Sequence, residues 1–221
     1  MIVDERIITF INSLDTKNSE ILEDIEREAL ADNVPIIRRE MQSFLKVLLM
    51  VKKPMRVLEV GTAVGFSALL MSEYVPEECA ITTIENYEKR IPIARQNFVR
   101  AGREKKITLL EGDAMDVLKT SEGPYDFIFM DAAKGQYIHY LPEILRLLAK
   151  GGILVSDNVM QDGDVIESRF AVERRDRTIH ARMREYLYEL KHNDALVTSI
   201  IPLGDGVALS VKKEVGTDIA Q

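Results

Sequence analysis

The stretch that decides the fold is MRVLEVGTAVGFSALL, residues 55–70, in which an apolar run passes through a turn into a helical pattern. The apolar run breaks at Gly61, and apolar residues at helical spacing follow it. This order predicts a buried strand, a tight turn and a helix. Gly61 and Gly65 would let the polar groups of a ligand approach the backbone and the helix N-terminus. The spacing is GxxxG, not the GxGxxG of a dinucleotide site, so a structural turn and a nucleotide-like cofactor site both remain open.

Length and composition are those of an ordinary globular protein. The chain has 221 residues, of which 46% are hydrophobic and 29% charged, and it can bury a substantial core. Asp4 and Glu5 near the start are unlike a signal peptide, and no apolar run approaches the ~20 residues that span a bilayer. Cys79 is the single cysteine, which excludes an internal disulfide, and no Cys/His cluster suggests zinc. We therefore expect a cytoplasmic protein without a membrane span, and its net charge of −7 argues against indiscriminate nucleic-acid binding.

The remaining elements alternate as in a parallel α/β protein. Residues 1–50 predict helices, strands are expected near 80–85, 107–113, 125–131 and 151–158, and a long helical segment is expected over about 164–192. Two final strands around Gly204-Asp205-Gly206 predict an antiparallel hairpin. The pattern predicts a doubly wound, Rossmann-like, mostly parallel sheet of about seven strands. We expect one domain over residues 1–221, with a helical cap at 1–50 and the Rossmann-like core at 51–213.

An acidic residue follows or ends each of the first five predicted strands, at the carboxyl edge where such sheets bind ligands. These residues are Glu59, Glu85, Asp113, Asp131 and Asp157, the last followed by Asn158. Acidic groups gathered on one edge repel one another unless cations or hydrogen-bond donors lie among them, which favours a site over unrelated surface carboxylates. Glu85 comes 24 residues after Gly61, roughly where an acidic residue binds ribose hydroxyls. Asp113 and Ala114 would then flank the adenine.

Three short oxygen ligands come from adjacent predicted strands. Asp131, Asp157 and Asn158 form a set that suits an octahedral Mg²⁺ with room for water and substrate oxygens. Lys134 follows closely in DAAKGQY. A neighbouring divalent cation disfavours the charged form of a lysine, so Lys134 is a candidate general base. A solvated loop lysine is the alternative interpretation.

In this order the motifs resemble the cation-dependent class I O-methyltransferases of the catechol and caffeoyl-CoA type, which use S-adenosylmethionine. The resemblance covers residues from about 34 to 213 and is carried by LEVGTAVGFSAL, TTIE, GDA, FIFMDAAKGQY, GGILVSDNV and IPLGDGVALS, with DAAK and DN the most specific. It implies cofactor contacts from Ile37, Glu59, Gly61, Thr62, Ser67, Glu85, Asp113, Ala114 and Asp131. It also implies Mg²⁺ or Mn²⁺ on Asp131, Asp157 and Asn158, and Lys134 as the base. Ala63 stands where many methyltransferases have a further glycine.

A basic run follows the predicted metal ligands. Residues 169–184 contain six arginines against Glu173 and Asp176. Such a run is usually a solvated helix face, yet arginine suits bidentate phosphate binding. The RRDRT-containing segment, with DAAKGQY and GDGVALS, looks like that of bacterial tRNA 5-hydroxyuridine methyltransferases. This resemblance implies tRNA as the substrate, methylation of wobble 5-hydroxyuridine to 5-methoxyuridine, and RNA contacts from Arg174, Arg175 and Arg177. The family resemblance also implies a homodimer with the N-terminal helices at the interface.

Three other functions share features with this sequence. A small-molecule O-methyltransferase for catechol-like vicinal diphenols would need the same site chemistry. A nicotinamide-dependent oxidoreductase is disfavoured because GxGxxG and a Ser-Tyr-Lys pattern are missing. An RNA-binding module without catalysis would not be expected to keep Asp131, Lys134, Asp157 and Asn158 together.

Overall fold

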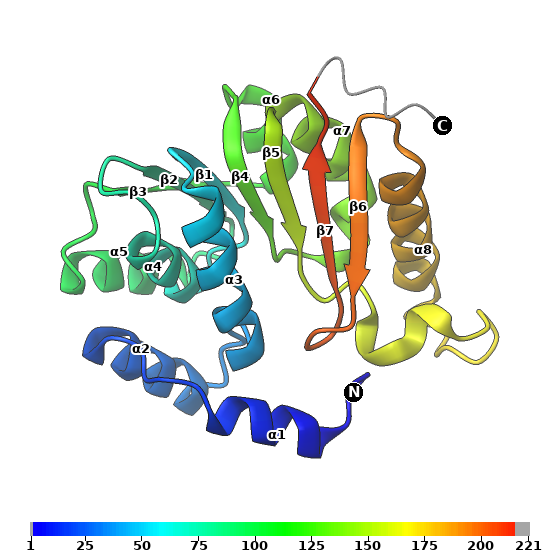
Figure 1. Cartoon of the computed structure of the whole chain (residues 1–221), viewed down its shortest axis with the longest axis horizontal. Coiled ribbons are helices and arrows are strands. Elements are labelled where there is room, and N and C mark those ends of the chain that lie inside the picture. The colour runs from blue at the N-terminus through cyan, green and yellow to red at the C-terminus, as the bar shows by residue number, and fades with distance from the viewer. Residues whose placement is uncertain (1, 215–221) are drawn as a thin grey trace. The chain divides into compact units, whose positions relative to one another are not determined.

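The computed structural model describes residues 2–214, which contain a seven-stranded sheet in the order β3-β2-β1-β4-β5-β7-β6 (Figure 1). The pairs β1–β2, β2–β3 and β4–β5 are parallel, whereas β7 pairs antiparallel with both β5 and β6. The predicted Rossmann-like sheet, C-terminal hairpin and N-terminal helices are therefore confirmed. None of the helices in residues 2–214 combines the length and the hydrophobicity that a membrane span requires.

The chain divides into two compact units, which we call the N-terminal unit (residues 3–117) and the C-terminal unit (residues 118–214 with Ile2). The N-terminal unit contains α1 (Glu5–Ser13), α2 (Glu20–Ala31), α3 (Arg39–Lys52), β1 (Arg56–Val60), α4 (Phe66–Glu73), β2 (Ala80–Glu85), α5 (Ile91–Arg100) and β3 (Ile107–Glu111). Helix α6 (Ala114–Thr120) leads from this unit into the next. The single-domain boundaries predicted from the sequence stay a prediction, and their ends, residues 1 and 215–221, lie outside the described residues.

The C-terminal unit carries the remaining elements. They are β4 (Tyr125–Met130), the 3₁₀ turn η1 (Lys134–Gln136), α7 (Tyr137–Leu147), β5 (Leu148–Ser156), the 3₁₀ segment η2 (Gln161–Ile166), α8 (Arg177–His192), β6 (Leu196–Ile201) and β7 (Val207–Lys212). Helix α8 packs against β6, α7 and η1. In Figure 1 it runs beside β6.

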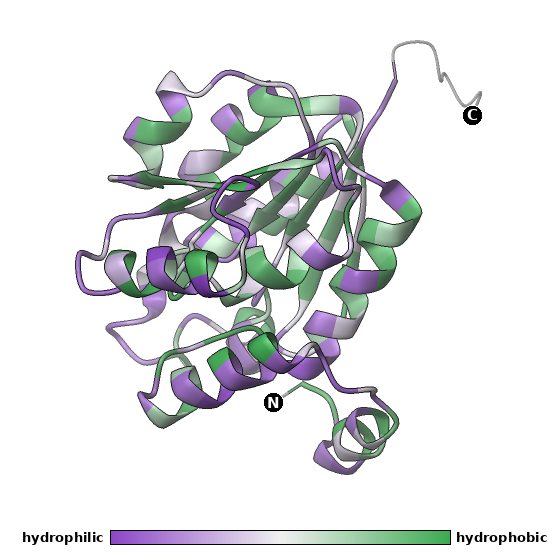
Figure 2. Cartoon of the chain, turned by 90° about the vertical axis from the view of Figure 1, so that its left-hand side faces the viewer, coloured by the Kyte–Doolittle hydropathy of each residue, from purple (hydrophilic) through white to green (hydrophobic). Residues whose placement is uncertain are grey.

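Burial explains why these segments form strands and helices. Parallel strands are covered on both faces and so consist of almost continuous apolar residues. In β4, residues 127–130 (FIFM) are completely buried, and the strands are largely hydrophobic in Figure 2. Several helices, by contrast, show both hydrophilic and hydrophobic stretches, because one side packs on the core. Helix α4 is the exception, since it is buried from Phe66 to Ser72 among α2, α3, α5, β2 and β3.

The helix predicted over about 164–192 is wrong in its first part. Helix α8 begins only at Arg177, so Arg174 and Arg175 lie outside it. The predicted segment opens instead with the last residues of η2, which ends at Ile166. Glu167 is then extended, with ψ of 162°. The sequence pattern missed this break because the apolar residues on either side of it keep helical spacing.

Candidate functional site

The turn after β1 is held in left-handed conformations at three positions. The φ values are +104° at Gly61, +48° at Ala63 and +85° at Gly65. A Cβ atom at Gly65 would lie 2.5 Å from the Phe98 ring, so glycine is required there by both conformation and space. Asn97 from α5 fixes the same turn by donating through Nδ2 to the Val64 carbonyl at 2.9 Å. Sequence reasoning found the glycines and missed Asn97, which lies 33 residues away.

Glu59, at the end of β1, is completely buried and lies in a chain of side-chain hydrogen bonds. The Thr83 hydroxyl donates to its Oε2 at 2.5 Å. Because the single proton of Thr83 is used there, the Thr62 hydroxyl, 2.6 Å from Thr83 Oγ1, must be the donor in that pair. Two neighbouring strands and the glycine turn are thereby tied to one buried carboxylate.

Glu85, at the end of β2, organises the same turn through its carboxylate. Oε2 accepts from the Ala63 amide at 2.7 Å, and Oε1 accepts from the amides of Asn86 and Tyr87 at 3.0 and 2.9 Å. A carboxylate offers roughly four acceptor positions. One hydroxyl can therefore bind directly, whereas a ribose diol, as the sequence predicted, requires one of these amides to give way.

The other predicted cofactor residues in this unit have defined structural partners. Asp113 is exposed, and its Oδ1 accepts from the Met115 amide at 2.9 Å at the start of α6, where Ala114 is the first residue. Ile37 is buried, and its carbonyl accepts from Gln42 Nε2 at 3.2 Å. Ser67 is buried in the first turn of α4. Their contacts with a cofactor stay predictions.

In the C-terminal unit, the predicted metal ligands follow the ends of β4 and β5. Asp131 comes directly after β4, and Asp157 and Asn158 come directly after β5. The strands are joined at this level by the Asp157 amide, which donates to the Met130 carbonyl at 3.0 Å. Asp157 is 5% exposed, whereas Asp131 and Asn158 are half-buried. Asn158 has a φ of +55°, and its amide donates to Asp157 Oδ1 at 2.7 Å.

The surroundings of Asp131 and Asp157 disfavour the ionised form of both carboxylates. Burial raises the pKa of Asp131, although the charge of Lys134 opposes the shift. Burial, together with the negative charge of Asp131, raises the pKa of Asp157 to about 7. A divalent cation would offset the repulsion between the two groups.

The chemistry of this donor set fits a hard cation. Among the described residues no three His, Cys, Asp or Glu side chains form a metal-binding group, and the candidate site is instead two carboxylates and one amide. Oxygen ligands of this kind, completed by water or substrate, suit Mg²⁺ or Mn²⁺. The structure thus brings Asp131, Asp157 and Asn158 to neighbouring strand ends, and Lys134 close enough to influence both carboxylates.

A further buried carboxylate, Asp205, lies in the turn between β6 and β7 and was read from the sequence only as a turn residue. Its Oδ1 accepts a hydrogen bond from the Asp162 amide, and its carbonyl accepts from the Met160 amide at 2.9 Å. The Gly206 carbonyl accepts from the Val159 amide at 2.9 Å. The hairpin therefore holds the segment that follows Asn158. The GDG motif was the available signal.

The three predicted RNA-binding arginines differ in their surroundings. Arg174 is exposed and makes no hydrogen bond or ion pair with another described residue. Arg175 is exposed and pairs with Glu173 and Asp176 at 3.0 and 3.4 Å. Arg177 donates through Nε to the Val172 carbonyl at 3.3 Å, and its guanidinium lies 6.0 Å from the ring centre of Phe170.

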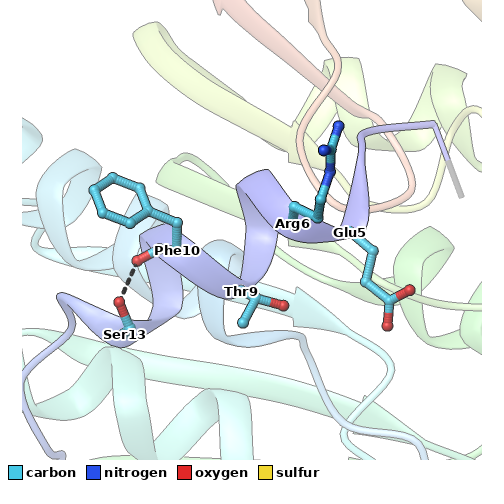
Figure 3. A pocket seen from close by; sticks show the side chains of 5 residues that line it. All are labelled: Glu5, Arg6, Thr9, Phe10 and Ser13. Carbon is cyan, nitrogen blue, oxygen red and sulfur yellow. Dashed lines mark hydrogen bonds between the residues drawn. The ribbon is translucent and has the colours of Figure 1, made fainter.

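A hollow on α1 lies apart from the predicted site residues. It is lined by Glu5, Arg6, Thr9, Phe10 and Ser13, and Figure 3 shows these side chains along the helix. The Ser13 hydroxyl donates to the Phe10 carbonyl at 2.6 Å. None of the residues predicted to bind cofactor, metal or RNA lines this hollow.

Comparison with known proteins places the chain in a family. The model of the O-methyltransferase family matches residues 12–213. A caffeoyl-CoA O-methyltransferase of Populus trichocarpa is 33% identical over 183 residues, covering 75% of this chain and 70% of the poplar protein. A catechol O-methyltransferase of Niastella koreensis is 34% identical over 128 residues, covering 56% of this chain and 58% of that protein. The SAH-bound structure of a Podospora anserina methyltransferase has a TM-score of 0.86 at 26% identity, covering 95% of each chain.

These matches define the class. The chain belongs to the O-methyltransferase family, in the S-adenosylmethionine-dependent class that includes catechol and caffeoyl-CoA enzymes. The predicted family resemblance is confirmed at this level.

Proposed function

We propose that this protein transfers a methyl group from S-adenosylmethionine to the 5-hydroxyl of wobble 5-hydroxyuridine in tRNA, giving 5-methoxyuridine, with Mg²⁺ or Mn²⁺ as the cation. The observation that carries the cation-dependent chemistry is the Asp131–Asp157 pair. Burial and mutual repulsion raise the pKa of Asp157 to about 7. Such a pair is costly for folding unless it binds a cation, so a functional role accounts for it better than a structural one.

The chain's own residues supply binding, orientation and proton transfer. Glu59, Glu85 and the turn at Gly61 would hold the cofactor, whose sulfonium methyl is the group transferred. Asp131, Asp157 and Asn158 would hold a cation, which as a Lewis acid favours ionisation of a bound hydroxyl. Lys134 would accept the proton of that hydroxyl. Holding acceptor and donor in register supplies much of the rate acceleration in such a transfer.

The substrate proposal draws on acceptor chemistry and on the surface before α8. The 5-hydroxyl and 4-carbonyl of 5-hydroxyuridine are neighbouring oxygens, as are the two hydroxyls of a catechol. Arg174 is free to contact phosphate, and Arg175 has only exposed carboxylate partners to exchange. Exposed ion pairs contribute about 0–1 kcal/mol, so a phosphate can replace them at little cost. Phe170, whose ring lies beside the Arg177 guanidinium, is 85% exposed. An exposed aromatic ring next to a cation is suited to stacking against a nucleobase of single-stranded RNA.

The test is mass spectrometry of tRNA nucleosides from a strain that lacks this gene. We expect 5-hydroxyuridine to accumulate and 5-methoxyuridine to disappear, with both restored by the wild-type gene. Restoration should fail with Asp157→Ala. Unchanged 5-methoxyuridine in the deletion strain would refute the tRNA substrate.

The alternative substrate is a small catechol-like diphenol, favoured by the identities to catechol and caffeoyl-CoA enzymes. The two proposals separate in a competition assay with the purified protein. A tRNA enzyme should methylate an anticodon stem-loop containing 5-hydroxyuridine at far lower concentration than catechol. The reverse order would favour the alternative.

We also propose that the protein is a homodimer with α1 at the interface. Helix α1 buries none of its residues, and Ile7, Phe10, Ile11 and Leu14 are 45–68% exposed. Exposed apolar residues gathered on one helix are typical of an interaction surface. Light scattering should give twice the chain mass for wild type and the chain mass for Phe10→Glu. An Arg6→Glu control should stay dimeric, and a monomeric wild type would refute the proposal.

A further inference from the structure

Tyr137 is the first residue of α7, and its side chain is completely buried. Its hydroxyl oxygen lies within hydrogen-bonding distance of three main-chain groups. It accepts from the Ala132 amide at 3.2 Å, and it can donate to the Met130 carbonyl at 3.1 Å or the Asp157 carbonyl at 3.2 Å. A phenol has one proton, so the two carbonyls share it.

These three groups surround the candidate metal ligands. Met130 and Ala132 are the residues on either side of Asp131, and the third contact is the carbonyl of Asp157 itself. The register of β4 and β5 ends with the pair Met130–Ser156, and the Asp157 amide makes the next cross-strand bond. The Tyr137 hydroxyl thus connects the segments that follow β4 and β5, at the point where both leave the sheet.

The same residue also fixes the turn that carries Lys134. The Tyr137 amide donates to the Lys134 carbonyl, closing the 3₁₀ turn η1. On the other side of this turn, Arg182 Nη1 donates to the Gly135 carbonyl at 3.1 Å. The Tyr137 hydroxyl therefore closes the loop from Asp131 to Tyr137, because it bonds to main-chain groups on either side of Asp131.

We propose that Tyr137 is a positioning residue whose hydroxyl holds the main chains of Asp131 and Asp157 at the separation that a divalent cation requires. The proposal rests on the cation site proposed above and adds a residue to it. Two carboxylates tend to move apart when no cation lies between them, and the strand ends lack further ladder pairs beyond this level in the described register. The buried Tyr137 hydroxyl bonds to the segments after both β4 and β5 and so resists this movement. The site is therefore preformed before the cation binds.

The alternative is that Tyr137 only fills the core. Tyr186 provides the matched control, because it is also completely buried and its ring meets that of Tyr137 edge to face, with centroids 5.5 Å apart. The Tyr186 hydroxyl lies 2.6 Å from the Ser156 hydroxyl. Its partner is therefore a side chain, whereas the partners of the Tyr137 hydroxyl are main-chain groups at the candidate ligands. Removing either hydroxyl costs a buried hydrogen bond, but only the Tyr137 hydroxyl bonds to main-chain groups of Asp157 and of the residues on either side of Asp131.

The experiment compares Tyr137→Phe and Tyr186→Phe in the full chain. Mn²⁺ affinity is measured by electron paramagnetic resonance of the free ion, without cofactor or substrate, and unfolding is followed in EDTA. We expect Tyr137→Phe to weaken Mn²⁺ binding by ~10-fold or more, the usual effect of losing a group that orients a metal ligand. Tyr186→Phe should stay within about two-fold of wild type while losing similar thermal stability. Equal Mn²⁺ affinities in the two variants would overturn the proposal.

Two further measurements separate the possible failures. Wild-type protein that binds no Mn²⁺, or Asp157→Ala that binds it normally, would refute the cation site itself and this proposal with it. If Tyr137→Phe does not fold, amide exchange of the wild type decides. The Ala132 amide should exchange slowly and more slowly still with Mg²⁺, whereas exchange as fast as that of exposed Ala133 would overturn the proposal.

Discussion

The Ala63 amide donates a 2.7 Å hydrogen bond to the carboxylate of Glu85, from a residue whose φ is +48°. Glu85 at the end of β2 thus holds the turn that follows β1 in a conformation that an alanine rarely adopts. The residue predicted to bind the cofactor ribose is also a structural support of the glycine turn.

Replacing Glu85 with alanine should weaken S-adenosylmethionine binding ten-fold or more, which corresponds to about 1.4 kcal/mol. The variant loses the acceptor for a ribose hydroxyl and the support of Ala63. Isothermal titration calorimetry measures the change. Glu111→Ala is the matched control, because Glu111 is the register partner of Glu85 on β3 and pairs instead with Arg95 at 2.6 Å. Unchanged affinity in Glu85→Ala, or an equal loss in both variants, would contradict the ribose assignment.

Without a divalent cation, the protein should lose stability as the pH rises from about 4 to about 8. Burial and the charge of Asp131 raise the pKa of Asp157 to about 7 in the folded protein, whereas in the unfolded chain it is about 3.9. Between these values the folded state binds more protons than the unfolded state, so the free energy of unfolding falls with rising pH.

Thermal unfolding in EDTA across this pH range measures the effect. Asp157→Asn should flatten the dependence, and Mg²⁺ should restore stability most at the upper end, where the carboxylate is ionised. A slope that is the same in wild type and Asp157→Asn would show that other groups cause it.

Lys134→Ala should lower kcat by about 10²–10⁴-fold, the usual contribution of general acid–base catalysis. The loss should be equal for an RNA and for a free diphenol, because the proton removed is the same. Lys134→Arg keeps the positive charge near Asp131 and should be equally inactive, since a guanidinium does not act as a base at neutral pH. An active Lys134→Arg would assign the lysine an electrostatic role.

Arg174→Ala should raise KM for tRNA and reduce the salt dependence of binding by about one phosphate contact. Turnover of a small diphenol should not change, since Arg174 makes no bond to the rest of the described chain. Arg177→Ala is expected to lower the melting temperature as well, because the bond to the Val172 carbonyl is lost. If Arg174→Ala binds tRNA as wild type does, Arg174 belongs to an ordinary solvated surface, and the small-molecule substrate becomes the better proposal.

The sequence by itself determined the order and type of most elements. A buried parallel strand is largely apolar, so β1, β2, β4 and the second half of β5 stand out as mainly apolar or β-branched runs, each ending at or beside an acidic residue. The glycines at 61 and 65, and Asp131, Lys134 and Asp157 close after strand ends, could likewise be recognised as candidate site residues, because turns and strand ends leave local signals in the sequence.

Only the tertiary structure decided which distant residues support the site. Asn97 on the Val64 carbonyl, Asp205 on the Asp162 amide and the Tyr137 hydroxyl on Asp157 join segments 20 to 43 residues apart. Such contacts leave no periodic signal, since each depends on where two elements pack and not on the local sequence. The turn before the predicted helix was missed for the same reason, because left-handed Asp162 is held through its amide by the carboxylate of Asp205, 43 residues later in the chain.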